Sequence, residues 1–204
     1  MKLYGGIDLH SNNSVLGLID EQDKVVYEKR LDNKQERILN ELKTYRKHVV
    51  GLAVESTYNW YWLVDGLMDA GYRAIHLANP CAVKQYEGLK YADDRHDAFW
   101  LAHLLALGIL PEGYIYPKKD RPVRDLLRKR SFLVKQRTML ILSLKSLVER
   151  QTSLRLSRSE VKTLEPSDLE LLLPDEHLIL SAQANVSTIS FLSQQITQIE
   201  KAIK

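Results

Sequence analysis

Residues 2–31, KLYGGIDLHSNNSVLGLIDEQDKVVYEKRL, contain three short apolar runs that two turn-forming clusters separate. The runs cover residues 2–9, 13–20 and 24–31, and the clusters between them are HSNN and EQD. Apolar runs of this length, bounded by Asn, Ser and Asp, are typical of β-strands joined by short turns. The stretch therefore predicts a three-stranded antiparallel meander at the start of the chain.

The residues that follow alternate between helical and strand patterns. Residues 33–48 carry apolar side chains at helical intervals after Asn33, which we predict to be the N-cap. The apolar run VVGLAVE (49–55) suits a buried parallel strand, residues 59–71 suit a helix, and residues 72–78 suit a further strand. The predicted order is therefore β-β-β-α-β-α-β.

Three antiparallel strands followed by helix-linked parallel strands are the order of the ribonuclease H-like (RuvC-like) fold. In that α/β fold the first strand lies at the centre of a mixed sheet with flanking helices. The strand after the first helix pairs parallel with it through a right-handed crossover. We therefore expect Asp8, on the first strand, to lie beside Glu55, at the end of the fourth.

The stretch YADDRHDAFWLAHLLA (91–106) predicts a helix with three acids near its start. Carboxylates near a helix N-terminus interact favourably with the helix dipole, which is our explanation for Asp93. Asp94 and Asp97 are three residues apart, so they share a face with Leu101, which should point at the core. Carboxylates beside a core need a partner, which could be a basic side chain, backbone donors or a metal ion.

The predicted fold can bring four carboxylates together: Asp8, Glu55, Asp94 and Asp97. Their oxygen atoms suit Mg²⁺ or Mn²⁺, and such ions can activate a nucleophile and stabilise a leaving oxygen in phosphodiester chemistry. We therefore predict that these four residues are catalytic and bind the metal. Each acid alone also has a structural explanation: Asp8 could accept hydrogen bonds from the following turn, and Glu55 could cap the next helix.

Positive charge is concentrated in one part of the chain. Residues 118–158 hold 13 Lys+Arg and 3 Asp+Glu, net +10, whereas residues 1–117 hold 13 and 16, net −3, and residues 159–204 hold 3 and 7, net −4. This excess is more than solubility requires, although a charge run is often only a solvated face. We predict a nucleic-acid-binding surface made of Lys118, Lys119, Arg121, Arg124, Arg128, Lys129, Lys135 and Arg137.

Heptad spacing begins in the same segment. Leucines recur every seven residues from Leu126 to Leu154, and apolar residues alternate spacings of three and four from Ile189 to Ile203. This pattern predicts long helices that form a coiled coil and carry self-association as a dimer or tetramer. We therefore expect two domains, residues 1–117 and residues 118–204. The pattern reaches almost to the last residue, and we expect the sequence to be part of a longer chain.

Composition narrows the cellular context. The single cysteine, Cys81, excludes an internal disulfide and a Cys-rich zinc site. The first residues contain no apolar run of a signal peptide, and no apolar stretch has the length of a membrane span. We predict a cytoplasmic protein with no membrane partner.

Four motifs carry a resemblance to a known family: GIDLH (6–10), VESTYNWYWLVDGL (54–67), GYRAIHLANP (71–80) and DDRHDAFWLAHLL (93–105). They resemble the DEDD transposases of the insertion-sequence 110/1111 family, and the resemblance continues through the basic helix at 123–149. It implies a RuvC-like domain whose acids correspond to Asp8, Glu55, Asp94 and Asp97. Asp93 is the alternative third acid, and Asp94 is favoured because it lies three residues before Asp97.

The resemblance also implies a coiled coil and a C-terminal domain with a nucleophilic serine, which these 204 residues do not include. A family member is expected to be an oligomeric recombinase that binds DNA, uses a structured guide RNA, and joins DNA through a transient serine–phosphate bond. The four acids of one subunit would combine with the serine domain of another.

Three other classes of protein share some of these features. A Mg²⁺-dependent Holliday-junction resolvase or nuclease would share the fold and the acids, but it does not need long heptad helices. A non-catalytic RNA- or DNA-binding coiled-coil module is the second alternative. An actin-like or sugar-kinase ATPase is disfavoured, because the chain has only nine glycines and no second phosphate-binding motif.

Overall fold

The structure is a computed structural model, which describes the backbone of residues 1–89 and 94–203 and the side chains of residues 1–86 and 97–203. The chain forms two compact units, Met1–Ile115 and Tyr116–Lys204. This division falls two residues before the predicted domain boundary. Each unit has its own hydrophobic core.

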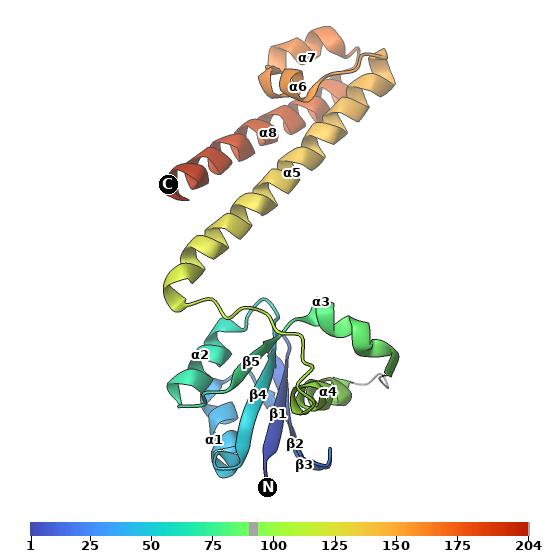
Figure 1. Cartoon of the computed structure of the whole chain (residues 1–204). Coiled ribbons are helices and arrows are strands. Elements are labelled where there is room, and N and C mark those ends of the chain that lie inside the picture. The colour runs from blue at the N-terminus through green and yellow to red at the C-terminus, as the bar shows by residue number, and fades with distance from the viewer. Residues whose placement is uncertain (90–93, 204) are drawn as a thin grey trace. The chain divides into compact units, whose positions relative to one another are not determined.

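The first unit is built on a five-stranded mixed sheet with the strand order β3-β2-β1-β4-β5 (Figure 1). Strand β1 pairs antiparallel with β2 and parallel with β4, while β3 pairs antiparallel with β2 and β5 pairs parallel with β4. The predicted ribonuclease H-like arrangement, with the first strand at the centre, is confirmed. The strands are β1 (Leu3–Leu9), β2 (Asn13–Asp20), β3 (Val25–Asp32), β4 (Val49–Glu55) and β5 (Ile75–Ala78).

Helices cover both faces of this sheet. Helices α1 (Gln35–Tyr45) and α2 (Tyr61–Asp69) lie on one face and α4 (Asp94–Ala106) on the other (Figure 1). Because side chains alternate along a strand, one face of the sheet packs its aliphatic residues with α1 and α2, while the other face places Gly6, Gly17 and Ala53 against α4. On β1 the α4 face therefore carries Gly6 and Asp8.

Helix α4 lies unusually close to the sheet because glycine faces it. A Cβ atom at Gly6 would overlap the carbonyl oxygen of Ala98 and lie 3.0 Å from the amide nitrogen of Ala102. A Cβ at Gly17 on β2 would lie 2.8 Å from the ring of Phe99. The backbone of α4 thus packs directly on β1, which fixes the position of Asp97, the residue before Ala98.

The predicted N-cap of α1 is wrong. The cap position belongs to Lys34, which makes no side-chain capping bond. The Asn33 amide instead ties the meander together: its Oδ1 accepts a hydrogen bond from Ser14 Oγ at 2.5 Å, and its Nδ2 donates to the carbonyl of His10 at 2.8 Å. Asn33 therefore bonds Ser14 and the His10 carbonyl of the meander, and it does not cap the helix as the local sequence pattern predicted.

Short helical segments connect β5 to α4. Asn79 is the N-cap of α3 (Pro80–Val83), because its Oδ1 accepts hydrogen bonds from the backbone N–H groups of Cys81 and Ala82. A 3₁₀ helix, η1 (Lys84–Leu89), follows. This segment borders the end of the sheet where β1 and β4 finish.

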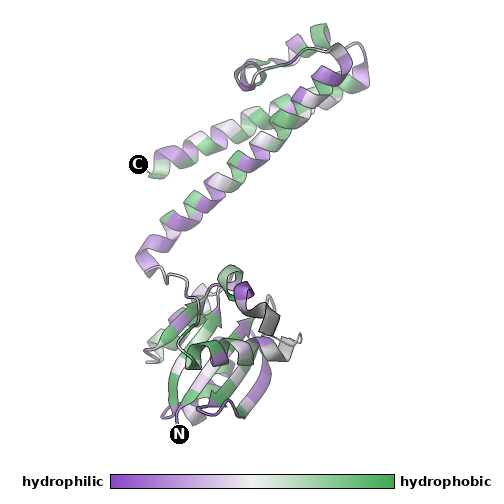
Figure 2. Cartoon of the chain, turned by 45° about the vertical axis from the view of Figure 1, so that its right-hand side comes forward, coloured by the Kyte–Doolittle hydropathy of each residue, from purple (hydrophilic) through white to green (hydrophobic). Residues whose placement is uncertain are grey.

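The second unit is helical. It contains the 3₁₀ helix η2 (Lys118–Asp120) and the helices α5 (Arg121–Thr152), α6 (Arg158–Thr163), α7 (Pro166–Leu172) and α8 (Glu176–Ile203). Helix α5 ends at Ser153, which has a left-handed backbone conformation with φ of 61°. Hydrophobic and hydrophilic residues alternate along α5 and α8, as Figure 2 shows.

Helices α5 and α8 form an antiparallel hairpin. Arg130 Nε donates to Glu200 Oε1 at 2.7 Å, and Arg137 Nη1 donates to Ser193 Oγ at 3.2 Å. The predicted seam residues Ile189, Leu192 and Ile196 are buried in this hairpin. The heptad pattern is therefore used, at least in part, for packing within one chain. None of the described helices is long and apolar enough to cross a membrane.

Candidate functional site

Two of the predicted acids follow directly from the sheet register. Ile7 of β1 pairs with Val54 of β4, so Asp8 and Glu55 are the next residues at the carboxyl ends of two adjacent parallel strands. Both residues point to the face that α4 covers, because each follows a residue that points into the core on the opposite face. The sheet therefore places two carboxylates at the same end of the sheet, on the same face.

Helix α4 supplies a third carboxylate at this end of the sheet. Asp8, Glu55 and Asp97 line one cavity of about 130 Å³ beside the end of the sheet. Among the described residues, the cavity is also lined by Ala78, Pro80, Val83, Lys84, Trp100 and Leu101. Sequence reasoning did not single out Lys84 or Trp100. Trp100 could have been found, because it lies three residues after Asp97 and therefore on the same helical face.

Asp8 is buried, with only 3% of its surface exposed. His10 Nε2 lies 3.0 Å from Asp8 Oδ2, but neither atom has a hydrogen-bond partner of acceptable geometry among the described residues. Ser14, one of the turn residues that could have donated to Asp8, donates to Asn33 instead, and Asp8 Oδ2 accepts no hydrogen bond from a described donor. A buried carboxylate oxygen without a donor is costly unless a cation or another donor approaches it.

The structural explanation for Glu55 does not apply. Helix α2 begins after Trp60, which occupies the N-cap position without a side-chain capping bond. Trp60 itself is buried in the core. Glu55 therefore does not cap the helix that follows it.

The fourth predicted acid cannot be placed as fully. Asp94 is the first residue of α4, but its side chain lies outside the described residues, and Asp93 lies outside them altogether. The same holds for the side chains of Lys90, Arg95 and His96, which are the alternative partners for Asp97.

The donor chemistry of the cavity suits a hard divalent ion. Carboxylate oxygens from Asp8, Glu55 and Asp97 are the ligands that Mg²⁺ and Mn²⁺ prefer. Among the described side chains, however, no three Asp, Glu, His or Cys residues are spaced closely enough to hold one ion. The cavity thus gathers suitable donors without closing them around a single point.

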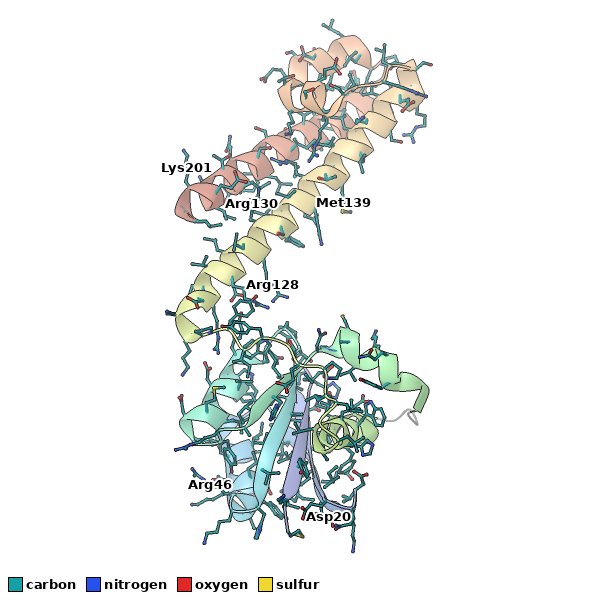
Figure 3. The ribbon with its side chains drawn as sticks, in the orientation of Figure 1. Asp20, Arg46, Arg128, Arg130, Met139 and Lys201 are labelled. Carbon is teal, nitrogen blue, oxygen red and sulfur yellow. The ribbon has the colours of Figure 1, made fainter. Side chains whose placement is uncertain are left out.

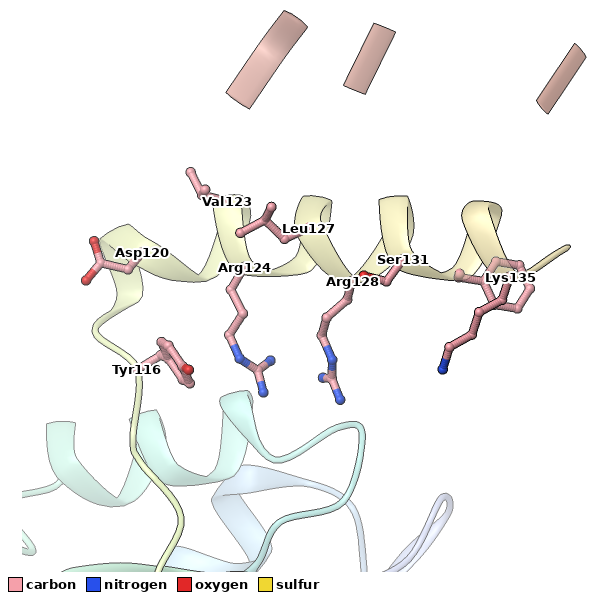
Figure 4. A pocket seen from close by; sticks show the side chains of 9 residues that line it. Tyr116, Asp120, Val123, Arg124, Leu127, Arg128, Ser131 and Lys135 are labelled. Atoms are coloured by element: carbon pink, nitrogen blue, oxygen red, sulfur yellow. The ribbon is translucent and has the colours of Figure 1, made fainter. Parts of the chain in front are cut away.

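The basic segment forms a second candidate site on α5. Arg124, Arg128 and Lys135 lie on one face of the helix and line an open groove of about 760 Å³. Figure 4 shows the three side chains extending from the same side of α5, and Figure 3 places Arg128 on that helix among its other side chains. The groove is also lined by Tyr116, Asp120, Val123, Leu127, Ser131 and Phe132.

The other predicted cations have different surroundings. Arg121 is 7% exposed, and its Nε donates to the carbonyl of Tyr116 at 2.8 Å, so it holds the start of α5 and is not presented to a ligand. Arg137 faces α8 and bonds Ser193. Lys118 and Lys119 are exposed on η2, and Lys129 lies over the ring of Phe132, 5.5 Å from its centroid.

The fold and the acidic cavity define a class of protein. A central strand β1, with a parallel neighbour β4 and acids at the ends of both, is the framework of ribonuclease H-like enzymes that process DNA or RNA. A family profile described as "Transposase", for DEDD transposases of the insertion-sequence 110 type, matches residues 5–152. The chain belongs to this transposase family, whose members are DNA-processing enzymes.

The sequence and the fold were also compared with solved structures and with curated proteins. Among solved structures, the chain is similar to "T. thermophilus RuvC in complex with Holliday junction substrate", with a TM-score of 0.43 and 16% sequence identity. The similarity covers 55% of this chain and 100% of the RuvC chain. No curated protein matches this sequence.

Proposed function

We propose that this chain is the metal-binding and nucleic-acid-binding part of a DNA recombinase. The observation that carries the proposal is the single cavity shared by Asp8, Glu55 and Asp97 in a member of the DEDD transposase family. Three separate elements, β1, β4 and α4, supply these acids. A purely structural role for any one of them does not account for all three meeting.

In this proposal Asp8, Glu55 and Asp97, together with Asp94, hold Mg²⁺ or Mn²⁺. The ion would supply Lewis-acid stabilisation of a phosphodiester oxygen and activation of a nucleophile. The rigid contact of α4 with β1 through Gly6 holds Asp97 at the cavity. The buried Oδ2 of Asp8 accepts no hydrogen bond from a described donor, although His10 Nε2 lies 3.0 Å from it.

Calorimetric titration with Mn²⁺ tests this site. The Asp8→Asn variant keeps the size of the side chain and removes its charge, and it should bind Mn²⁺ at least about tenfold more weakly, since even groups that only orient metal ligands have effects of that size. Asp69→Asn on α2 is the matched control, because Asp69 is an exposed acid outside the cavity. Equal Mn²⁺ affinity in the two variants would refute the site.

The basic face of α5 is the proposed phosphate-binding surface. Arg124, Arg128 and Lys135 share one helical face and one groove, and the seam that packs against α8 lies on the opposite side. Binding through these residues releases counterions from the nucleic acid, so affinity should fall steeply with salt. The contacts should be largely insensitive to sequence, because phosphates carry none.

Salt titrations of DNA binding test this surface. Changing Arg124, Arg128 and Lys135 to Ala together should lower the log–log salt slope by roughly two to three units, at about 0.9 per duplex contact or 0.7 per single-strand contact. A control variant with Lys24, Lys34 and Lys47 changed to Ala removes the same charge from exposed positions of the first unit. If both triple variants lower the slope equally, the assigned surface is wrong.

The full reaction of the proposed recombinase needs a nucleophile. No serine is among the described residues that line the acidic cavity. We propose that a serine domain supplies the attacking hydroxyl, that DNA is the substrate, that a structured guide RNA assists in target choice, and that two or four copies assemble.

A further inference from the structure

Exposed aromatic and apolar side chains lie among the cations of the α5 groove. Phe132 is 53% exposed although it is large and apolar, and two other apolar residues that line the groove, Val123 and Leu127, are also exposed. Exposed apolar residues grouped in a concave surface commonly mark a binding site. Phosphate binding alone uses only charged and hydrogen-bonding groups, so it leaves these residues unexplained.

Tyr116 is held in this groove by two contacts. Its carbonyl accepts the hydrogen bond of the buried Arg121, which anchors the residue to the start of α5. The guanidinium of Arg124 lies over its ring, 4.6 Å from the centroid. A flat ring and a flat cation are therefore stacked in advance at one end of the groove. Phe132 lies two helical turns further along the helix.

We propose that the groove binds an unpaired stretch of nucleic acid. Its bases stack on Phe132 and on the Tyr116–Arg124 pair, while Arg128 and Lys135 contact phosphates. In a duplex the base faces are covered by neighbouring base pairs, but an unpaired strand exposes them to aromatic side chains. The inference rests on the proposed phosphate-binding role of this face and adds the kind of nucleic acid that it takes.

The dimensions and the charge of the groove agree with this occupant. From Arg124 to Lys135 the helix rises about 16 Å, which is room for a few nucleotides. Three cations and one acid, Asp120, line the groove, so its side chains carry a net charge of +2. A second copy of this chain seated symmetrically on the groove would bring like charges together, which disfavours that occupant.

Fluorescence anisotropy with three labelled probes tests the inference: a 12-nucleotide dT strand, a 12-nucleotide U strand and a 12-base-pair duplex of mixed sequence. Phe132→Leu removes the flat ring and keeps most of the apolar volume. It should weaken binding of both single strands by about fivefold or more, because one stacked base is lost, and change duplex binding by less than twofold. Similar losses on dT and U are expected because stacking uses the base face.

Phe191→Leu is the matched control, because Phe191 is 57% exposed on α8 and does not line this groove. It should leave all three affinities unchanged. Equal losses of single-strand and duplex binding in Phe132→Leu, or no loss at all, would overturn the inference. A change in its sedimentation with unchanged binding would also overturn it, since a second copy would then occupy the groove. Changing only Arg128 and Lys135 to Ala reports separately on the phosphate-binding role, because this double variant keeps the Tyr116–Arg124 pair.

Discussion

Replacing Gly6 by Ala should be far more damaging than one added methyl group suggests. The new Cβ would overlap the Ala98 carbonyl oxygen, and it would lie 2.8 Å from the Ala98 carbonyl carbon and 3.0 Å from the Ala102 amide nitrogen. These are backbone atoms in the middle of α4, so no side-chain rotation relieves the overlap. The helix must shift away from β1 as a body.

The expected magnitude follows from this geometry. Overpacking in a core costs about 1–3 kcal/mol when side chains can adjust, and we expect Gly6→Ala to reach or exceed the upper end because they cannot. Gly17→Ala is the internal comparison, since its Cβ would meet only the edge of the Phe99 ring, which can turn. We expect a cost of about 1 kcal/mol there. Domain stabilities are roughly 5–15 kcal/mol, so the difference is measurable.

Urea unfolding followed by circular dichroism gives the two free energies. Mn²⁺ titration of the same variants gives a second readout, because moving α4 also moves Asp97 away from Asp8. Gly113→Ala serves as control: its backbone φ is ordinary and its Cβ would make only normal contacts with Leu77. A Gly6→Ala variant no less stable than Gly17→Ala, with unaltered Mn²⁺ affinity, would refute the close-packing argument.

Three further outcomes are expected. The chain should sediment as a dimer or larger, and Leu142→Lys should shift it toward monomer, because Leu142 is an exposed apolar residue of α5. If the unchanged chain and the variant both sediment as monomers, the exposed side of α5 does not carry self-association. The pKa of Glu41 is lowered from its ordinary 4.5 by hydrogen bonds from Lys29 and then Tyr27, so its contribution to stability is present above pH 4.5 and lost as pH falls through the lowered value. Glu41→Gln should therefore flatten the dependence of the urea midpoint on pH between 6 and 3, and an unaltered dependence contradicts this. Denaturing gels of the 204-residue chain incubated with DNA and Mn²⁺ should show no covalent protein–DNA adduct, because no described residue that lines the acidic cavity is a serine. An adduct would contradict the proposal that the nucleophile comes from a separate serine domain.

The sheet and its acids were predictable because their signals are local and periodic. Apolar runs with turn clusters predicted the three-stranded meander, and the continuous run before Glu55 predicted a buried parallel strand. Once β4 is placed beside β1, the position of Glu55 follows from register alone. The sequence pattern could not reveal how closely α4 approaches, because that distance depends on Gly6 meeting the backbone of Ala98 across 92 positions of sequence.

The roles of individual cations were less predictable. Composition located the basic segment, but it could not separate Arg121 from Arg128, which lie seven residues apart on nearly the same face of α5. Arg121 is buried because it lies in the first turn and donates to the Tyr116 carbonyl of the preceding loop, whereas Arg128 is exposed. The heptad pattern likewise indicated helix pairing without telling whether the partner is another chain or α8. Only the short helices α6 and α7, which reverse the direction of the chain, make pairing within one chain possible.

Helix α5 carries the residues that pack against α8 and the residues of the proposed binding groove on opposite sides. Arg130 and Arg137 are engaged by Glu200 and Ser193 of α8, whereas Arg128 and Lys135 lie in the groove on the other side. In the proposed role, a substitution in the groove can therefore change nucleic-acid binding without loosening the hairpin. Over evolutionary time such a helix can acquire a new ligand preference while its stability is conserved.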